Sequence, residues 1–496
     1  MSTVEYPSID WLAITPLIIL LGGMLVTLVV AALTPVWRRG TYALATAVLV
    51  VPTVIVEMVL WNRIGHEGPV SIINDALSID RFAILVWIAI AIAVALVSLS
   101  TAEYLRREDL DGPETYALYV CAALGGMIMA SANDLIVLFL GLETLSIALY
   151  VLAASHRRRA ESQESGLKYF VLGGFASAFF LYGIALLYGA SGTTNISAMG
   201  EAFAGGVLTG NDDAMLLAGV ALLLVGLAFK VAAAPFHFWT PDVYQGAPTP
   251  VTSFMASVGK LAAFAAMLRV LVVALGNRAD DWRPVIWVLA VASVVIGSVL
   301  AVVQSDVKRM LAYSSISHAG FILIGVEAAG HGNADGVASS LLYLVLYGVL
   351  VIGSFTVVTL VARTGDANTG VGAFRGLGRE RPLLALAMTV FVLAQAGMPV
   401  TSGFIAKFSV IKAAADSESY AVAIVAMVAS VIAAVLYLRI MINMWMADPE
   451  SGDESREAVR VPLTAGVVVA LGAAFTLFAG IFPGWLIDAT RDAVLR

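Results

Sequence analysis

Residues 227–239, LAFKVAAAPFHFW, place Lys230 and Pro235 inside a run that otherwise has the composition of a membrane-buried helix. A buried lysine brings a charge into hydrocarbon, and a proline removes one backbone hydrogen bond and bends the helix. Irregular backbone at membrane depth is tolerated where it lines a polar or water-filled cavity. The stretch therefore predicts a membrane helix that is interrupted beside a buried charge.

The composition of the whole chain agrees with a membrane protein. Of its 496 residues, 60% are hydrophobic and 13% are charged, which leaves too little polar surface for a water-soluble globule. The single cysteine, Cys121, excludes internal disulfides and Cys-ligated zinc or iron–sulfur sites. A net charge of -7 gives no basic footprint for nucleic acid, and no phosphate-binding glycine loop or metal-ligand cluster is evident. We expect no nucleic-acid, metal or cofactor site in this chain.

The sequence predicts an all-α, polytopic membrane fold, because a spanning helix needs roughly 20 apolar residues and about fourteen segments reach that length. They lie near residues 11–34, 41–62, 78–101, 114–131, 134–154, 164–190, 214–240, 250–275, 284–303, 307–328, 336–362, 383–412, 419–446 and 461–487. Lys and Arg gather in alternate loops, for example at 38–39, 106–107, 157–159 and 308–309, whereas 189–213 has none. Since basic loops stay cytoplasmic, we expect a multi-pass cell membrane protein with both termini outside. The acidic stretch 447–460 is the exception.

Lysines are rare and unevenly placed. Only six of the 28 basic residues are lysines, and Lys168, Lys230, Lys260 and Lys407 fall within predicted spans. Lysine changes its protonation state readily on burial, whereas arginine keeps its proton. We interpret these lysines as parts of a proton path. The alternative is a lysine that only joins helices or extends its ammonium to the surface, which applies most to Lys168 near the cytoplasmic end.

Further titratable residues fall at similar depths. Glu143 lies nine residues past Asp134, about 13 Å along a helix, so it reaches the middle of the membrane and needs a partner. Lys230 is the candidate, and hydroxyls on Thr144 or Ser146 are the alternative. Lys230 and Lys260 lie at equal chain distances from the loop centred near residue 245, which predicts similar depths.

Two histidines are candidate proton relays. His237 follows Lys230 by seven residues and should share its helix face, and His318 lies on a hydroxyl-rich span. For each, a histidine that only packs between helices is an equal alternative.

A second interrupted helix is expected at LAQAGMPVTSGFIAKFSV, where Gly397, Pro399 and Gly403 precede Lys407. It lies five crossings after the first, so the two should run antiparallel, as the inverted repeats of transporters do. The predicted division is residues 1–113 (helices 1–3), 114–275 (first repeat, helices 4–8), 276–447 (second, inverted repeat, helices 9–13) and 448–496 (a loop and helix 14).

Three stretches resemble a known family: FKVAAAPFHFWTPDVYQGAPTPVTSFMASVGK, SDVKRMLAYSSISHAGF and GMPVTSGFIAKFSV. They are similar, over roughly residues 115 to 445, to the antiporter-like membrane subunits of respiratory complex I, the proton-pumping NADH:quinone oxidoreductase. Those subunits are related to the large subunits of Mrp-type cation/proton antiporters. Within the family, PDVYQGAPTPV and a lysine at position 407 look most like the subunit N branch.

The resemblance implies a proton-translocating subunit driven by quinone reduction elsewhere in a larger complex. It implies that Glu143 and Lys230 form the ion pair of the channel, that Lys260 connects the halves and that Lys407 serves the exit half. NADH, FMN, iron–sulfur clusters and quinone would be held by other subunits. The expected partners are other membrane subunits, including neighbouring antiporter-like ones, and the lipid bilayer. A stand-alone cation/proton antiporter and a scaffold subunit are the alternatives.

The predicted topology can be tested with introduced cysteines. A cysteine near Arg158 should react with a membrane-impermeant thiol reagent only from the cytoplasm, and one near Thr194 only from outside, because the basic loops stay inside. Labelling of both positions from one side would contradict the topology and the inverted repeats with it.

Overall fold

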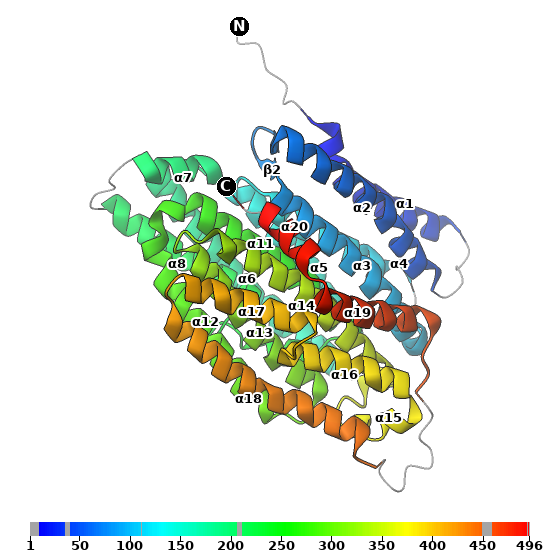
Figure 1. The fold of residues 1–496 in the computed structure, drawn as a ribbon. Coiled ribbons are helices and arrows are strands. Elements are labelled where there is room, and N and C mark those ends of the chain that lie inside the picture. The colour runs from blue at the N-terminus through cyan, green and yellow to red at the C-terminus, as the bar shows by residue number, and fades with distance from the viewer. Residues whose placement is uncertain are drawn as a thin grey trace.

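The computed structural model describes residues 9–34, 40–110, 112–205, 211–448, 459–493 and 495. Long helices pack side by side in one bundle, with α1 and α2 at one edge and α18 at the opposite edge (Figure 1). The α-helices are α1 (Trp11–Leu33), α2 (Thr41–Glu67), α3 (Arg81–Glu108), α4 (Pro113–Ser131), α5 (Leu135–Ala153), α6 (Ala160–Ser191), α7 (Ile196–Gly205), α8 (Asn211–Val231), α9 (Trp239–Gly246), α10 (Thr249–Phe254), α11 (Lys260–Arg269), α12 (Ala279–Val302), α13 (Val307–Ala329), α14 (Ala334–Val361), α15 (Leu377–Glu380), α16 (Pro382–Ala396), α17 (Ser402–Asp416), α18 (Tyr420–Trp445), α19 (Leu463–Ile481) and α20 (Gly484–Asp492). Shorter turns are π-helical η1 (Met255–Gly259) and η2 (Val270–Ala274), and 3₁₀ η3 (Gly276–Arg278), η4 (Thr364–Asp366) and η5 (Val371–Phe374). Strands β1 (Val70–Ile72) and β2 (Leu77–Ile79) pair antiparallel.

The predicted all-α membrane fold is confirmed. Within the described residues, twelve helices are long and apolar enough to cross a membrane. The other two predicted segments, 114–131 and 383–412, coincide with α4 and with the pair α16 and α17. The count of fourteen spans stays a prediction. Most of the acidic loop and the basic residues at 38–39 lie outside the described residues.

One local arrangement occurs twice in the bundle. Asp134 caps α5 by accepting the backbone N–H of Ile136 at 2.8 Å, and Asp306 caps α13 by accepting that of Arg309 at 2.9 Å. Each capping carboxylate also accepts a threonine hydroxyl from beyond the following helix, from Thr194 in the first case and from Thr369 in the second. The same sequence of helix, cap and return segment is thus built in both halves.

The two copies lie at opposite ends of the bundle. Asp366 accepts Arg159 Nη1 at 3.2 Å and Lys308 Nζ at 3.2 Å. Because Arg159 follows the end of α5 and Lys308 opens α13, α13 begins at the end where α5 finishes. This arrangement supports the predicted inverted repeat, although the repeat boundaries stay predictions.

Both predicted interruptions are present. Helix α8 ends at Val231 and α9 starts at Trp239, so residues 232–238 are not helical. Groups near this break find partners: the Ala234 N–H donates to Ser293 Oγ at 2.8 Å, and Trp239 Nε1 donates to the Phe229 carbonyl at 3.0 Å. Helix α16 ends at Ala396 and is capped by Gly397, which has a φ of 91°, and α17 begins at Ser402.

The second interruption gives a prediction about Gly403. A Cβ added there would lie 1.8 Å from the Ala394 carbonyl oxygen, a backbone atom that cannot move aside easily. We expect Gly403→Ala to lower the unfolding temperature of the purified protein by several degrees, because overpacking of this kind costs about 1–3 kcal/mol of folding free energy. Gly174→Ala is the control, because its Cβ meets nothing within 4 Å. Equal unfolding temperatures for both variants would contradict the close approach of α16 and α17.

A buried lysine path through the bundle

Lys230 lies at the end of α8, with its side chain held by uncharged groups. Its ammonium donates to Ser146 Oγ on α5 at 2.6 Å. It also lies 5.8 Å and 5.5 Å from the ring centres of Tyr150 and Tyr169, within the range of a cation–π attraction. The residue is 7% exposed.

The expected direct ion pair between Glu143 and Lys230 is absent. In the described part of the chain no oxygen of Glu143 lies within 4.0 Å of the Lys230 ammonium, and the carboxylate instead accepts the Ser177 hydroxyl of α6. The reason is local. Ser146 lies one turn further along α5 than Glu143, and its hydroxyl binds the Lys230 ammonium in place of the Glu143 carboxylate. A cavity of about 10 Å³ beside Ser177 and Lys230 has room for roughly one water.

Lys260 is the first residue of α11 and directly follows the π-helical turn η1. Its ammonium donates to the backbone carbonyl of Ser315 on α13 and lies 5.9 Å from the ring centre of Tyr347. π-helical turns inside α-helices occur often at functional sites. This turn has no evident signal in the sequence and was not predicted.

Helix α13 connects Lys260 to Lys407 through residues on one face. Ser315 accepts Lys260, His318 follows three residues later, and Phe321, three further, lies 4.8 Å from the Lys407 ammonium. Residues three apart stack along one side of a helix. Along α13, His318 therefore lies between the residue whose carbonyl accepts Lys260 and the residue whose ring faces Lys407.

His318 is fully engaged by two tyrosines. Its Nδ1 lies 2.7 Å from the Tyr343 hydroxyl and its Nε2 lies 3.2 Å from that of Tyr437. The Tyr437 hydroxyl also forms a hydrogen bond with the Ser314 hydroxyl, at 2.6 Å. These tyrosines come from α14 and α18, and the sequence analysis missed both because nothing in their spacing points toward His318.

Lys407 binds at the second interruption. Its ammonium donates to the Ala396 carbonyl at 3.0 Å, where α16 ends, and to Ser430 Oγ of α18 at 2.8 Å. A helix C-terminus carries unpaired carbonyls and a partial negative charge, so it stabilises a cation there. The left-handed Gly397 lets the lysine stem pass, since a Cβ at that position would lie 3.0 Å from Lys407 Cδ.

Two sequence predictions about Lys230 rested on a continuous helix; the first is wrong and the second, about depth, stays a prediction. His237 does not share a helix face with Lys230, because α8 ends at Val231 and residues 232–238 are irregular. His237 is buried, and its Nδ1 has no hydrogen-bond partner among the described residues. The same break removes the basis for placing Lys230 and Lys260 at equal depth, and the two ammonium groups contact different helices.

Lys168 lies at the edge of a polar cleft rather than in the apolar interior. Its side chain is 41% exposed and forms ion pairs with Glu164 at 2.5 Å and Asp242 at 2.9 Å. Burial raises the pKa of Asp242, but Lys168 and Arg309 outweigh that effect and hold its pKa below the usual value. The cleft has a volume of about 690 Å³.

Asp366 forms the buried wall of the same cleft. Its carboxylate accepts Lys308, Arg159 and the Thr249 N–H, the last at 3.1 Å. Burial raises its pKa, but the charges of Lys308 and Arg159 bring the pKa below the ordinary value. Lys308 is completely buried, which corrects its interpretation as a loop residue.

The six lysines divide into two groups by partner. Three bind carboxylates: Lys168 with Asp242, Lys308 with Asp366 and Lys412 with Asp416. The other three bind only uncharged oxygens among the described residues: Lys230, Lys260 and Lys407. Across the described ranges, no group of three His, Cys, Asp or Glu side chains is arranged to hold a metal ion.

Comparison with known proteins places the chain in a family. Residues 132–433 match the family described as NADH:quinone oxidoreductase/Mrp antiporter, TM. The chain is 39% identical to NADH-quinone oxidoreductase subunit N of Saccharopolyspora erythraea, over 98% of each sequence. It is 42% identical to the subunit N of Trichlorobacter lovleyi, over 87% of each. A chain of respiratory complex I from Thermus thermophilus with bound Aureothin superposes with a TM-score of 0.80 and 32% identity, covering 96% of this chain and 99% of that one. The chain belongs to the subunit N branch of the NADH:quinone oxidoreductase/Mrp antiporter family.

Proposed function

We propose that this chain is the proton-translocating membrane subunit N of a bacterial NADH-quinone oxidoreductase. One observation carries the proposal: three of the four buried lysines, Lys230, Lys260 and Lys407, bind only uncharged oxygens among the described residues, whereas the fourth is paired with a carboxylate. A carboxylate partner would hold a lysine in its charged form. An uncharged oxygen favours the charged form less, so the charged and neutral forms of the lysine are closer in free energy. The proposed path runs from the Glu143 and Lys230 region through Lys260 and His318 to Lys407.

Serine hydroxyls suit such a path because they can both accept and donate. Ser146 accepts the charged Lys230 ammonium while donating to the Leu142 carbonyl. After Lys230 loses a proton, the hydroxyl can rotate and donate to the neutral amine instead. Ser430 offers Lys407 the same exchange. Lys230 and Lys407 therefore each keep a hydrogen-bond partner in both protonation states.

The energy for this movement comes from outside the chain in our proposal. NADH, FMN, iron–sulfur clusters and quinone belong to other subunits, and this chain performs no redox step itself. Its partners are the neighbouring antiporter-like subunits and the other membrane subunits of the complex. Lys168 and His237 would serve as relays on the cytoplasmic side, with both termini outside.

The stand-alone antiporter alternative has a direct test. The purified chain, reconstituted alone in liposomes with an internal pH dye, should show no Na⁺- or K⁺-driven proton exchange. In matched liposomes, the whole complex should change the internal pH when NADH and quinone are added. Cation-driven exchange by the chain alone would favour the antiporter.

Lys407→Arg tests whether the residue must release its proton. Arginine keeps the positive charge but does not deprotonate, so we expect proton pumping to fall by at least about tenfold, equal to about 1.4 kcal/mol. NADH-driven pumping and quinone reduction would be measured in membranes with equal amounts of assembled complex. Lys412→Arg is the matched control on α17, because Lys412 is 52% exposed and paired with Asp416. Full pumping by Lys407→Arg would reduce this lysine to a structural counter-charge.

Glu143 and Lys230 give a second prediction. Since each of them binds a different serine, we expect coupling through space rather than through a direct ion pair. Glu143→Ala and Lys230→Met should each lower pumping, and the double variant should lose less than the sum, with an interaction energy of about 1 kcal/mol. Rates would be compared at equal assembly of all three variants. Strictly additive losses would mean that the two residues act independently.

A further inference from the structure

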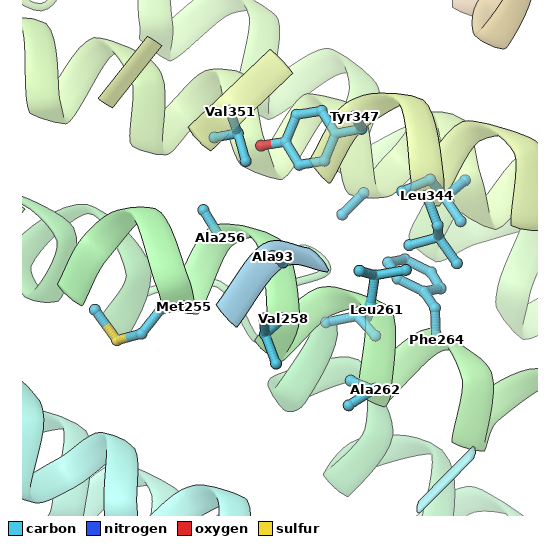
Figure 2. Close-up of a cluster of buried hydrophobic side chains, with 14 of the residues drawn as sticks. Ala93, Met255, Ala256, Val258, Leu261, Ala262, Phe264, Leu344, Tyr347 and Val351 are labelled. Atoms are coloured by element: carbon cyan, nitrogen blue, oxygen red, sulfur yellow. The ribbon is translucent and has the colours of Figure 1, made fainter. Parts of the chain in front are cut away.

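A long apolar groove, independent of the lysine path, opens on one side of the bundle. It has a volume of about 340 Å³ and lies between α3, α11, α14, α19 and α20. Figure 2 shows a cluster of buried hydrophobic side chains that includes two residues of the lining, Ala93 and Leu261. The lining is hydrophobic from Leu85 at one end of the α3 wall to Leu96 at the other.

The length of the groove matches one leaflet of a bilayer. Leu85 and Leu96 are eleven residues apart on α3, which corresponds to about 16 Å of helix. The hydrocarbon core of a bilayer is about 30 Å thick, so the groove spans roughly half of it. A neighbouring transmembrane helix, about 10 Å wide, would need a broader trough across the whole membrane. A single acyl chain fits both the length and the volume.

Arg81 lies just beyond the lining at the α3 N-terminal end of the groove, where its guanidinium packs against α2, and it is a group that suits a phosphate. Arg81 lies one turn before Leu85, on the same face of α3. Its guanidinium lies 5.1 Å from the ring centre of Trp61 and pairs with Asp492 at 3.1 Å. Arg81 Nε is buried, with no hydrogen-bond acceptor among the described residues. Arginine binds phosphate in a two-pronged geometry and so can take a second partner.

Two tryptophans belong to this region: Trp61 lies beside Arg81, and a second one is part of the lining. Trp485 of α20 lines the groove and is 49% exposed. Tryptophan gathers at the headgroup level of membranes, where one part of its ring is in hydrocarbon and the other meets water. The groove thus begins at an interface and ends near the middle of the membrane.

We propose that this groove binds a phospholipid of the predicted outer leaflet, with one acyl chain along α3 and its phosphate at Arg81. The chain would cover Leu261, the residue after Lys260, and would keep water away from that side of the lysine path.

Photochemical labelling of the assembled complex tests the site. A phosphatidylglycerol with a diazirine on one acyl chain would be added to purified complex, and cross-linked peptides identified by mass spectrometry. We expect labelling of peptides from α3 and α19. Ala89→Phe, which fills the groove, should lower it about tenfold, equal to about 1.4 kcal/mol. Ala421→Phe, on the exposed face of α18, is the matched control and should leave it unchanged.

Two further variants complete the test: one examines the phosphate contact, and the other replaces Ala89→Phe if that variant fails to assemble. Arg81→Gln should lower labelling by the phosphatidylglycerol probe but not by a diazirine-bearing long-chain alcohol, which lacks a phosphate. If Ala89→Phe does not assemble, Ile92→Trp at a more exposed lining position takes its place. Equal labelling of the unchanged complex and of the variant with the filled groove would overturn the proposal. Cross-links from these peptides to a helix of another subunit would overturn it as well. An equal response of both probes to Arg81→Gln would overturn the phosphate contact.

Discussion

Keeping ammonium groups inside an apolar bundle is the constraint on which the rest of this structure depends. Such a group needs hydrogen-bond acceptors, because water is excluded and an unpaired charge is very costly. Intact helices offer few, since their backbone carbonyls are already bonded within the helix. The fold meets the need by breaking helices and by placing serines next to the breaks. Lys407 shows both devices, with the Ala396 carbonyl at the end of α16 and the Ser430 hydroxyl across from it.

The breaks themselves require support from elsewhere in the chain. The backbone freed after Val231 is taken up by Ser293 on α12, so the first interruption depends on a helix from the other half. The second depends on Gly403, where α17 approaches the α16 backbone too closely for any side chain. The ends of the helices are fixed by capping aspartates, Asp134 on α5 and Asp306 on α13. The polar path is therefore held in place by matching features in the two halves, each of which has a supported helix break and a capping aspartate.

Sequence reasoning worked where a feature follows from length or residue type. The spans, both interruptions and the burial of Lys230, Lys260 and Lys407 follow from apolar length, from proline and glycine, and from the rarity of lysine. It failed where it extended helical periodicity across a break, as for His237. It also chose the wrong direct partner for Glu143, Lys230, because Ser177 belongs to another helix and its approach depends on packing. Tyr437 and the π-helical turn before Lys260 were missed for the same reason, since neither leaves a periodic pattern.

The contrast between the two groups of lysines explains how one residue type serves two purposes. Lys308 is as deeply buried as Lys260, yet it pairs with Asp366 and joins the start of α13 to the loop after α14. A buried ion pair of this kind favours the charged form of both partners and fixes the geometry between them. Lys260 has a backbone carbonyl in place of the carboxylate, so its charge is solvated without being neutralised. The partner, rather than burial alone, therefore separates a lysine that holds the fold from one that is suited to exchange a proton.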